Sequence, residues 1–386
     1  SACGSSPSRV SSALGGNRTG AVTMNRRELL LSAAALAIPA DLARSEPVKP
    51  ARNGALRILI LGGTGFIGPH FVREALAHGH AVTLFNRGKS QAQPTPGVET
   101  LLGDRDGQLD SLKGRDWDVV IDNSGYVPRH VRLTTELLRE RVRHYLFIST
   151  VAVYADLSAP GVTEDAPLKV LADPAVEEVR RDTYGGLKAL CEGVVRTDFD
   201  GRYTIVRPTY LVGPGDDTDR FTYWPWRMSQ GGDMLAPGTP DDPIQYLDVR
   251  DLARFVIAGA TIPHRGVFNA CSPPGFATLG QLLETSRDVT GASTKVHWVD
   301  IEFLKAQGVL DGPGLPIWRP PVGPTAGAAL VSSARAVATG LRFTPLEDTV
   351  RATLDWHRAR PPAERDKLQA GLTLEAEAAL LAKRRN

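Results

Sequence analysis

The sequence predicts an α/β protein in which helices cover both faces of a parallel sheet and a smaller α/β lobe follows. Between residues 56 and 207, short apolar runs alternate with helix-like segments such as 69–78 and 129–139. Strands separated by helices pair through right-handed crossovers, which produce a parallel sheet. The predicted strands are Arg57–Leu61, Ala81–Phe85, Glu99–Leu102, Asp118–Asp122, His144–Ser149 and Tyr203–Arg207.

Composition divides the chain into three regions. Residues 1–54 hold a Ser- and Gly-rich extension that we expect to be disordered, a short apolar segment and a polar linker. Residues 55–207 form the sheet domain, and later segments can complete its sheet. Residues 208–386 mix short elements with Pro and Gly turns and end in a predicted helix, so we interpret them as the smaller lobe.

Charge and cysteine content exclude several classes of protein. The 386 residues carry a net charge of +2, so no nucleic-acid partner is expected, and no apolar run is long enough for stable membrane insertion. Three cysteines without a CxxC pair exclude a disulfide framework and make a zinc site improbable. The acidic turn Asp216, Asp217 and Asp219 lacks a second group of ligands, so no metal is predicted.

A glycine loop follows the first predicted strand and opens a helix. Glycines 62, 65 and 68 in "GGTGFIG" permit a tight turn and let a pyrophosphate approach the backbone, while the helix N-terminus offers N–H groups to phosphates. This context predicts a Rossmann-type dinucleotide site. Its loop residues are Gly62, Thr64, Gly65, Phe66, Ile67 and Gly68.

The end of the second strand bears on which dinucleotide binds. An acidic residue there would favour NAD, but "TLFNRGKS" has Asn86, Arg87 and Lys89 instead, and cations suit the 2′-phosphate of NADP. NADP is therefore favoured over NAD, although these charges also fit a solvated loop. Asp104, in "LLGDRD", either accepts a hydrogen bond from the adenine amino group or caps the following turn.

Tyr184 and Lys188 lie four residues apart and so share one face of a predicted helix. Upstream, "HYLFISTVAVY" is a buried strand that ends near Thr150, at the sheet edge where ligands bind in such folds. The lysine charge would favour the tyrosine phenolate, and Thr150 would hold the substrate oxygen. The three side chains suit interconversion of an alcohol and a ketone with hydride transfer.

These motifs together resemble the extended short-chain dehydrogenase/reductase family, in its NAD-dependent epimerase/dehydratase branch. The resemblance runs from about residue 56 to 357 and includes "IVRPTYLVGPGD", "IQYLDVRDLARFV" and "LRFTPLEDTVRATLDWH". It implies Tyr184 as the acid/base group, Lys188 as its electrostatic and ribose-binding partner, and Thr150 as the hydroxyl member. It also implies cofactor contacts from Asn123, Ser124 and Pro208, although "IDNSGY" departs from the usual pattern of the branch.

The loop "GPGDDTDRFTYWPWRMSQGG" supplies candidate substrate residues. Trp224, Trp226 and Arg227 could form an aromatic wall with a cation for a sugar or a phosphate. The same aromatic residues could equally pack the lobe interface. Both interpretations stay open from the sequence.

The sequence therefore predicts an NAD(P)-dependent epimerase/dehydratase or oxidoreductase acting on a hydroxyl or keto group of a sugar or nucleotide sugar. The alternative is an NADP-loaded, non-enzymatic binding or sensor protein, either RNA-associated or redox-sensing. A small-molecule substrate is expected, and a homodimer is left open.

The segment "MNRRELLLSAAALAIPA", residues 24–40, resembles a twin-arginine export signal: a cationic start is followed by a short apolar run and small residues. The alternative is a chance Arg-Arg pair before an amphipathic helix. Twin-arginine export carries folded proteins, which suits a protein that collects a dinucleotide before export. We therefore expect a periplasmic location, or otherwise a cytoplasmic one.

Overall fold

The structure is a computed structural model that describes residues 54–89, 95–310 and 314–385. Everything described below belongs to one compact unit within residues 47–386. The predicted extension and export signal, and nearly all of the linker, lie outside the described residues. Within the described ranges, no helix has the length and apolar character needed to cross a membrane.

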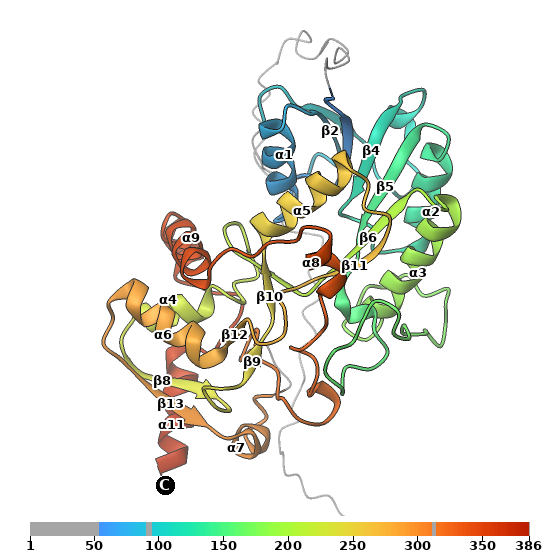
Figure 1. The fold of residues 1–386 in the computed structure, drawn as a ribbon. Helices are drawn as coiled ribbons and strands as arrows, with labels where there is room; N and C mark the ends of the chain where they lie inside the picture. The colour runs from blue at the N-terminus through green and yellow to red at the C-terminus, as the bar shows by residue number, and fades with distance from the viewer. Residues whose placement is uncertain (1–53, 90–94, 311–313, 386) are drawn as a thin grey trace, which may run out of the picture. The chain divides into compact units, whose positions relative to one another are not determined.

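The described unit is built on a seven-stranded sheet with the strand order β11-β6-β5-β4-β1-β2-β3 (Figure 1). All neighbouring strands run parallel. The inner strand β1 reads RILIL, and its last four side chains are fully buried because helices cover both faces. The predicted Rossmann-type fold is confirmed. Its strands are β1 (Arg57–Leu61), β2 (Ala81–Asn86), β3 (Glu99–Leu102), β4 (Trp117–Asp122), β5 (Val142–Ile148), β6 (Tyr203–Pro208) and β11 (Gly266–Ala270).

Alternate side chains of β1 point into two separate cores. Ile58 and Ile60 pack toward helices α1 and α5, whereas Leu59 and Leu61 pack toward α2 and α3. Figure 1 shows these two pairs of helices on the two sides of the sheet. The sheet is therefore covered on both sides, as a doubly wound fold requires. The helices are α1 (Gly68–Ala77), α2 (Pro128–Leu138), α3 (Tyr184–Asp198) and α5 (Val249–Thr261).

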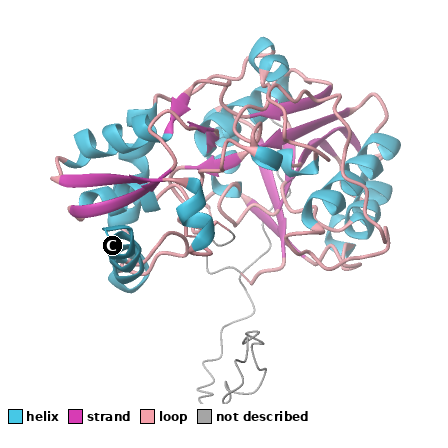
Figure 2. Ribbon diagram, turned by 90° about the horizontal axis from the view of Figure 1, so that it is seen from below, coloured by secondary structure: helices cyan, strands magenta, loops and turns pink. Residues whose placement is uncertain are grey.

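A second lobe follows β6 and has its own apolar core. Its three small strand pairs are β7 (Tyr210–Val212) with β10 (Tyr246–Asp248), β8 (Gly232–Pro237) with β13 (Thr294–Val299), and β9 (Pro243–Ile244) with β12 (Ala277–Thr278). Helix α11 lies beside the β8–β13 pair (Figure 2). The remaining helices are α4 (Tyr223–Ser229), α6 (Leu279–Thr290), α7 (Ile301–Ala306), α8 (Ala334–Ala338), α9 (Leu346–Arg358), α10 (Pro362–Arg365) and α11 (Leu374–Arg385).

The chain returns from the second lobe to complete the sheet. Strand β11 pairs with β6 at the sheet edge, and α5 packs against α1. The short run GVFNA of β11 was not among the predicted strands, because it resembles the surrounding turn-rich sequence. Residues after 207 therefore contribute to both halves of the structure.

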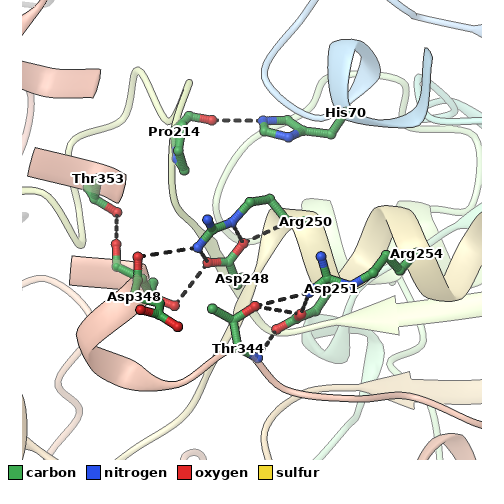
Figure 3. A network of polar contacts seen from close by, with 10 residues as sticks. His70, Pro214, Asp248, Arg250, Asp251, Arg254, Thr344, Asp348 and Thr353 are labelled. Carbon is green, nitrogen blue, oxygen red and sulfur yellow. Dashed lines mark hydrogen bonds and ion pairs between the residues drawn. The ribbon is translucent and has the colours of Figure 1, made fainter. Parts of the chain in front are cut away.

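Helix α5 is tied to the segment that leads into α9 (Figure 3). Asp248 caps the start of α5 by accepting from the Arg250 backbone N–H (2.8 Å), and its second oxygen accepts from the Thr349 hydroxyl (2.9 Å). Asp251 accepts from the backbone N–H and the hydroxyl of Thr344, at 2.7 and 2.8 Å. These contacts join the sequence motifs around residues 244–256 and 341–357 into one polar cluster.

Candidate active site

The glycines of the loop after β1 have different reasons to be glycine. A Cβ on Gly62 would lie 2.7 Å from the Cβ of Ser124, and one on Gly68 would lie 2.3 Å from the Gly63 carbonyl carbon. Both glycines thus allow close packing, and Gly62 also has a positive φ of +89°. A Cβ on Gly65, in contrast, would meet nothing within 4 Å. Gly65 therefore marks the open side of the loop, from which a pyrophosphate can approach.

The start of α1 also suits a phosphate group. No side chain caps the helix at Ile67, and the first turn contains no acidic residue, so the helix end keeps its positive character. Thr64, Phe66 and Ile67 are half-buried within this loop. The predicted loop residues therefore lie together, and they fit the phosphates of a dinucleotide.

Asn123 and Ser124 brace the glycine loop from the end of β4. The Asn123 side-chain amide donates to the Gly62 carbonyl (3.2 Å), and its backbone N–H donates to Leu61 (3.1 Å). Ser124 packs directly against Gly62. The structure thus brings both predicted residues to the loop, where they set its shape.

Sequence reasoning missed the buried ion pair beneath this turn. Both terminal nitrogens of Arg105 contact the Asp122 carboxylate, at 2.6 and 2.8 Å, and the Tyr145 hydroxyl donates to the same carboxylate (2.7 Å). Asp122 also accepts from the backbone N–H of Ser124 (3.1 Å). The pair therefore fixes the β4 turn that supports the glycine loop. The only sequence signal was the presence of complementary charges in "GDRD" and "IDN".

The end of β2 presents the residues expected near the adenosine ribose. The Asn86 side-chain oxygen accepts from the Gly88 N–H (2.9 Å), which shapes the turn, and Arg87 and Lys89 are exposed. Asp104 at the end of β3 accepts from the Asp106 N–H (3.1 Å). Asp104 therefore caps the following turn, which is one of its two predicted roles.

Thr150 and Tyr184 meet at the carboxyl end of β5. The Thr150 hydroxyl oxygen accepts from the Ala152 N–H (3.1 Å), and the Tyr184 hydroxyl hydrogen bonds to the Thr150 side chain. Glycine permits this approach: a Cβ on Gly185 would lie 2.1 Å from the Ala152 carbonyl oxygen. The "YGG" sequence thus lets the start of α3 come close enough to place the phenol against Thr150.

Burial dominates the acidity of the Tyr184 phenol. It raises the pKa of Tyr184 to about 12, and the neighbouring Tyr126 adds to this rise. The hydrogen bond from Thr150 and the charge of Arg220 lower the pKa but do not cancel the effect of burial. That Lys188 brings the phenol toward neutral pH stays a prediction, because in the free protein the loss of hydration has the larger effect on the pKa of Tyr184.

Lys188 lies one turn along α3 and is almost fully buried. Its ammonium donates to the carbonyls of Gly125 (2.7 Å) and Ile148 (2.6 Å), and it lies 4.1 Å from the centre of the Phe147 ring. Burial lowers the pKa of Lys188 to about 8. Because an ammonium group has three N–H donors, one remains for a ligand such as a ribose hydroxyl.

A second buried ion pair, also missed in the sequence, supports the end of β5. Arg207 contacts the Glu192 carboxylate at 2.9 and 2.6 Å, and the Ser149 hydroxyl donates to the same carboxylate (2.5 Å). Arg207 also donates to the Tyr154 hydroxyl (3.0 Å). Pro208 follows Arg207 as the buried last residue of β6. Strand ends β5 and β6 are thereby fixed relative to α3.

Two cations from the second lobe flank Tyr210, and sequence reasoning missed all three residues. The guanidinium of Arg220 lies 5.2 Å from the centre of the Tyr210 ring, and that of Arg319 lies 5.8 Å from it. Arg220 also acts electrostatically on Tyr184. These residues lie far apart in the sequence, so no spacing pattern could reveal them.

Backbone strain occurs just before each arginine. Among the described residues, the only non-glycine residues with positive φ are Asp219 (+55°) and Ile317 (+68°). The Asp219 carboxylate pairs with Arg360 (2.6 Å) and accepts from the Gln369 N–H (3.0 Å), which holds the strained turn in place. Strained residues tend to persist at functional sites, where surrounding contacts hold them.

The predicted substrate wall is corrected for two of its three members. Trp224 is fully buried and donates its indole N–H to the Pro316 carbonyl (2.8 Å), and Arg227 pairs with the buried Glu377 (2.7 Å). Trp226 is half-buried against the His357 ring. The packing interpretation therefore holds, because these side chains form the core of the second lobe. Trp224 instead braces the segment that carries Arg319.

No group of three or more metal-ligating side chains occurs in the described ranges.

The glycine loop, the open Gly65 and the hydroxyl–phenol–ammonium set together define a dinucleotide-dependent protein of the Rossmann type.

Comparison with known proteins identifies the family. Residues 58–271 match the model of the NAD dependent epimerase/dehydratase family. The chain therefore belongs to this family.

Individual relatives differ in function. The chain is 30% identical over 233 residues to the chloroplast stem-loop binding protein of 41 kDa b of Arabidopsis thaliana, a match covering 55% of this chain and 58% of that relative. It is 23% identical over 355 residues to the UDP-glucose 4-epimerase of Lactobacillus helveticus, covering 81% of this chain and all of the relative. The fold resembles the UDP-glucuronic acid 4-epimerase of Bacillus cereus in complex with NAD: the TM-score is 0.55 at 18% identity, covering 78% and 96% of the two chains.

Proposed function

We propose that the protein is an NAD(P)-dependent enzyme that epimerises, or otherwise oxidises and reduces, a hydroxyl-bearing carbon of a nucleotide sugar. The observation that carries this proposal is the hydrogen bond between Tyr184 and Thr150 beside the buried ammonium of Lys188. The described chain offers these groups at the carboxyl edge of a parallel sheet, next to the glycine loop.

Each side chain has a distinct part in the proposed reaction. Thr150 holds the reacting oxygen, and Tyr184 accepts its proton as the alcohol becomes a ketone and returns it in the reverse step. The one N–H of Lys188 that is not used on backbone carbonyls binds a cofactor hydroxyl, and its charge favours the phenolate. The nicotinamide, when bound, supplies hydride acceptance and donation. In an epimerase, the ketone would turn over in the site before Tyr184 returns the proton.

The cation pair around Tyr210 supports a substrate that carries phosphate groups. Arg220 and Arg319 supply guanidinium groups on either side of Tyr210, which suit a diphosphate, and the charge of Arg220 acts on Tyr184. Relatives in the family include proteins whose names specify UDP-sugars. We therefore place the nucleotide sugar with its diphosphate at these arginines and its reacting hydroxyl at Thr150.

For the cofactor, we propose NADP over NAD because Arg87 is exposed at the end of β2. Replacing Arg87 with Ala should weaken NADP binding and leave NAD binding nearly unchanged. Titration calorimetry with both dinucleotides measures this difference. Equal losses for both would contradict the assignment of Arg87 to the 2′-phosphate.

The test of function is product analysis after incubation with NADP, NAD and a panel of nucleotide sugars. Tyr184→Phe should abolish turnover while cofactor binding persists. Tyr203 is the first residue of β6, at the end of the strand away from the site, so Tyr203→Phe should leave both turnover and cofactor binding unchanged. Full activity of the Tyr184 variant would refute the assignment.

RNA binding is a second candidate function, favoured by one surface feature. A hollow of about 450 Å³ at the edge where β1, β4 and β5 begin is lined by Arg57, Arg139, Arg141, Arg143 and Arg202, together with acidic residues. The relative from Arabidopsis thaliana is named for stem-loop binding. A salt-dependent gel shift with stem-loop RNA, weakened in R139A/R141A, would support this candidate, and no shift at low salt would remove it.

We also propose export through a twin-arginine pathway, on the sequence around Arg26 and Arg27. Replacing both arginines with lysine should keep the protein in the cytoplasm. N-terminal sequencing of the periplasmic fraction tests this: protein retaining Met24 and found solely in the cytosol would contradict it.

A further inference from the structure

Tyr126 is a second phenol beside the Tyr184–Lys188 pair, and neither sequence motifs nor spacing pointed to it. It follows β4 in "IDNSGY", immediately after Gly125, whose carbonyl accepts from Lys188. Its ring lies 6.3 Å from the ring of Tyr184, and the Lys188 ammonium lies 5.2 Å from its centre. One short turn therefore both holds the ammonium and places a second aromatic ring beside it.

The surroundings of Tyr126 differ from those of a packing residue. Its side chain is 45% exposed, although the neighbouring Lys188 is only 3% exposed. The rings of Tyr126 and Phe147 both lie close to the ammonium. Tyr126 therefore covers the lysine and presents the rest of its surface to the open side of the site.

We propose that Tyr126 is a positioning residue that controls the ionisation of the Tyr184 phenol through the close approach of the two rings beside the Lys188 ammonium. This inference rests on the proposed role of Tyr184 as the acid/base group. Two phenols this close to each other are coupled, because a phenolate on either ring opposes a second negative charge on the other.

The directions in which neighbouring groups shift the pKa values of Tyr184 and Tyr126 agree with this coupling of the two phenols. Tyr126 raises the pKa of Tyr184, whereas the charge of Arg220 lowers it. Partial burial of the Tyr126 phenol, followed by the Asp122 carboxylate, raises the pKa of Tyr126 itself. The charged and titratable groups that act on the two phenols are Asp122 and Arg220, and those that act on the neighbouring Lys188 are Cys191, Asp122, Glu192 and Arg105. Asp122 is held by its ion pair beneath the turn.

The experiment measures tyrosinate absorbance against pH in the free, full-length protein, so it needs no substrate. The titration curve of Tyr184 is obtained by subtracting the absorbance of the protein that carries Tyr184→Phe from that of the protein without this substitution. This subtraction is made both with and without Tyr126→Phe. We expect the midpoint of the curve to fall by about one pH unit when Tyr126→Phe is introduced. Tyr203→Phe serves as the matched control, because it also removes one phenol but lies at the far end of β6.

A midpoint that stays within the scatter of the Tyr203→Phe control, or that rises, would overturn the inference. Tyr126→Leu provides a second variant without the hydroxyl, and it should give the same fall if the aromatic replacement does not fold. Turnover of the nucleotide-sugar panel is scored separately. A shifted midpoint without turnover therefore refutes the proposed function alone, and turnover without a shifted midpoint refutes the role of Tyr126 alone.

Discussion

Arg105 and Asp122 form a two-point ion pair that is shielded from solvent and lies directly under the turn supporting the glycine loop. Arg105 lies in the loop after β3 and Asp122 is the last residue of β4, so the pair fixes that loop against the end of β4. Because both charges have lost their hydration, each depends on its partner.

Removing one member of this pair should be strongly destabilising. Arg105→Met leaves the Asp122 carboxylate buried without a counter-charge, which costs about 3–5 kcal/mol of unfolding free energy. Urea denaturation measures the loss. Arg351→Ala, which breaks the exposed pair with Glu347, is the control and should cost at most about 1 kcal/mol. Similar losses for the two variants would contradict the importance of the buried pair.

Two glycines of α3 should respond in opposite ways to alanine. The Cβ of Gly185→Ala would clash with the Ala152 carbonyl oxygen, so the helix start must move and the Tyr184–Thr150 contact is lost. A destabilisation of about 1–3 kcal/mol is expected. Gly193→Ala meets nothing within 4 Å and should stabilise the helix by up to about 1 kcal/mol. Thermal unfolding compares the two, and a stable Gly185 variant would show that the close approach is unimportant.

Gly65 tests whether the loop binds a dinucleotide. Gly65→Ala has room for its Cβ in the free protein, so its melting temperature should stay close to that of the unmodified protein. The added side chain occupies the side open to the pyrophosphate, and dinucleotide affinity should fall about tenfold or more. Calorimetry and thermal unfolding measure the two effects. Unchanged affinity would mean that the phosphates bind elsewhere.

His144 should make the protein sensitive to acid. Burial lowers its pKa to about 4, helped by the charges of Arg265 and Arg202, while an unfolded histidine titrates near 6.5. Between these values the unfolded chain binds the extra proton, so stability is present above pH 6.5 and is lost as pH falls toward 4, by up to about 3 kcal/mol. His144→Gln should lose less stability over this range in urea titrations at each pH. An equal loss of stability would show that the protonation of His144 does not differ between the folded and the unfolded protein.

The sequence predicted the elements whose signals are local. The glycine loop, the six strands up to Arg207 and the i, i+4 pair of Tyr184 and Lys188 each depend on residues within one turn or one strand. Their placement together follows from the topology of a parallel sheet. Thr150 follows the carboxyl end of β5, which is the edge of the sheet where ligands bind in this fold.

The remaining site residues depend on contacts that spacing does not encode. Arg220 and Arg319 are about a hundred positions apart and meet only across Tyr210. Trp224 could equally have faced a ligand or a core, because an aromatic side chain suits both, and only its buried indole hydrogen bond separates them. The sequence also does not show whether Tyr126 faces a core or the site, because its exposure depends on the turn formed around Asp122.

Strand β11 has a consequence for how the chain assembles. Until residue 270 has been synthesised, the outer edge of β6 has no partner, and its backbone groups are available to other chains. A fragment ending at residue 207 would therefore contain every predicted dinucleotide-loop residue and still be prone to aggregate. The first domain can therefore fold completely only late in synthesis, because β11 must pair with β6 before the sheet is complete.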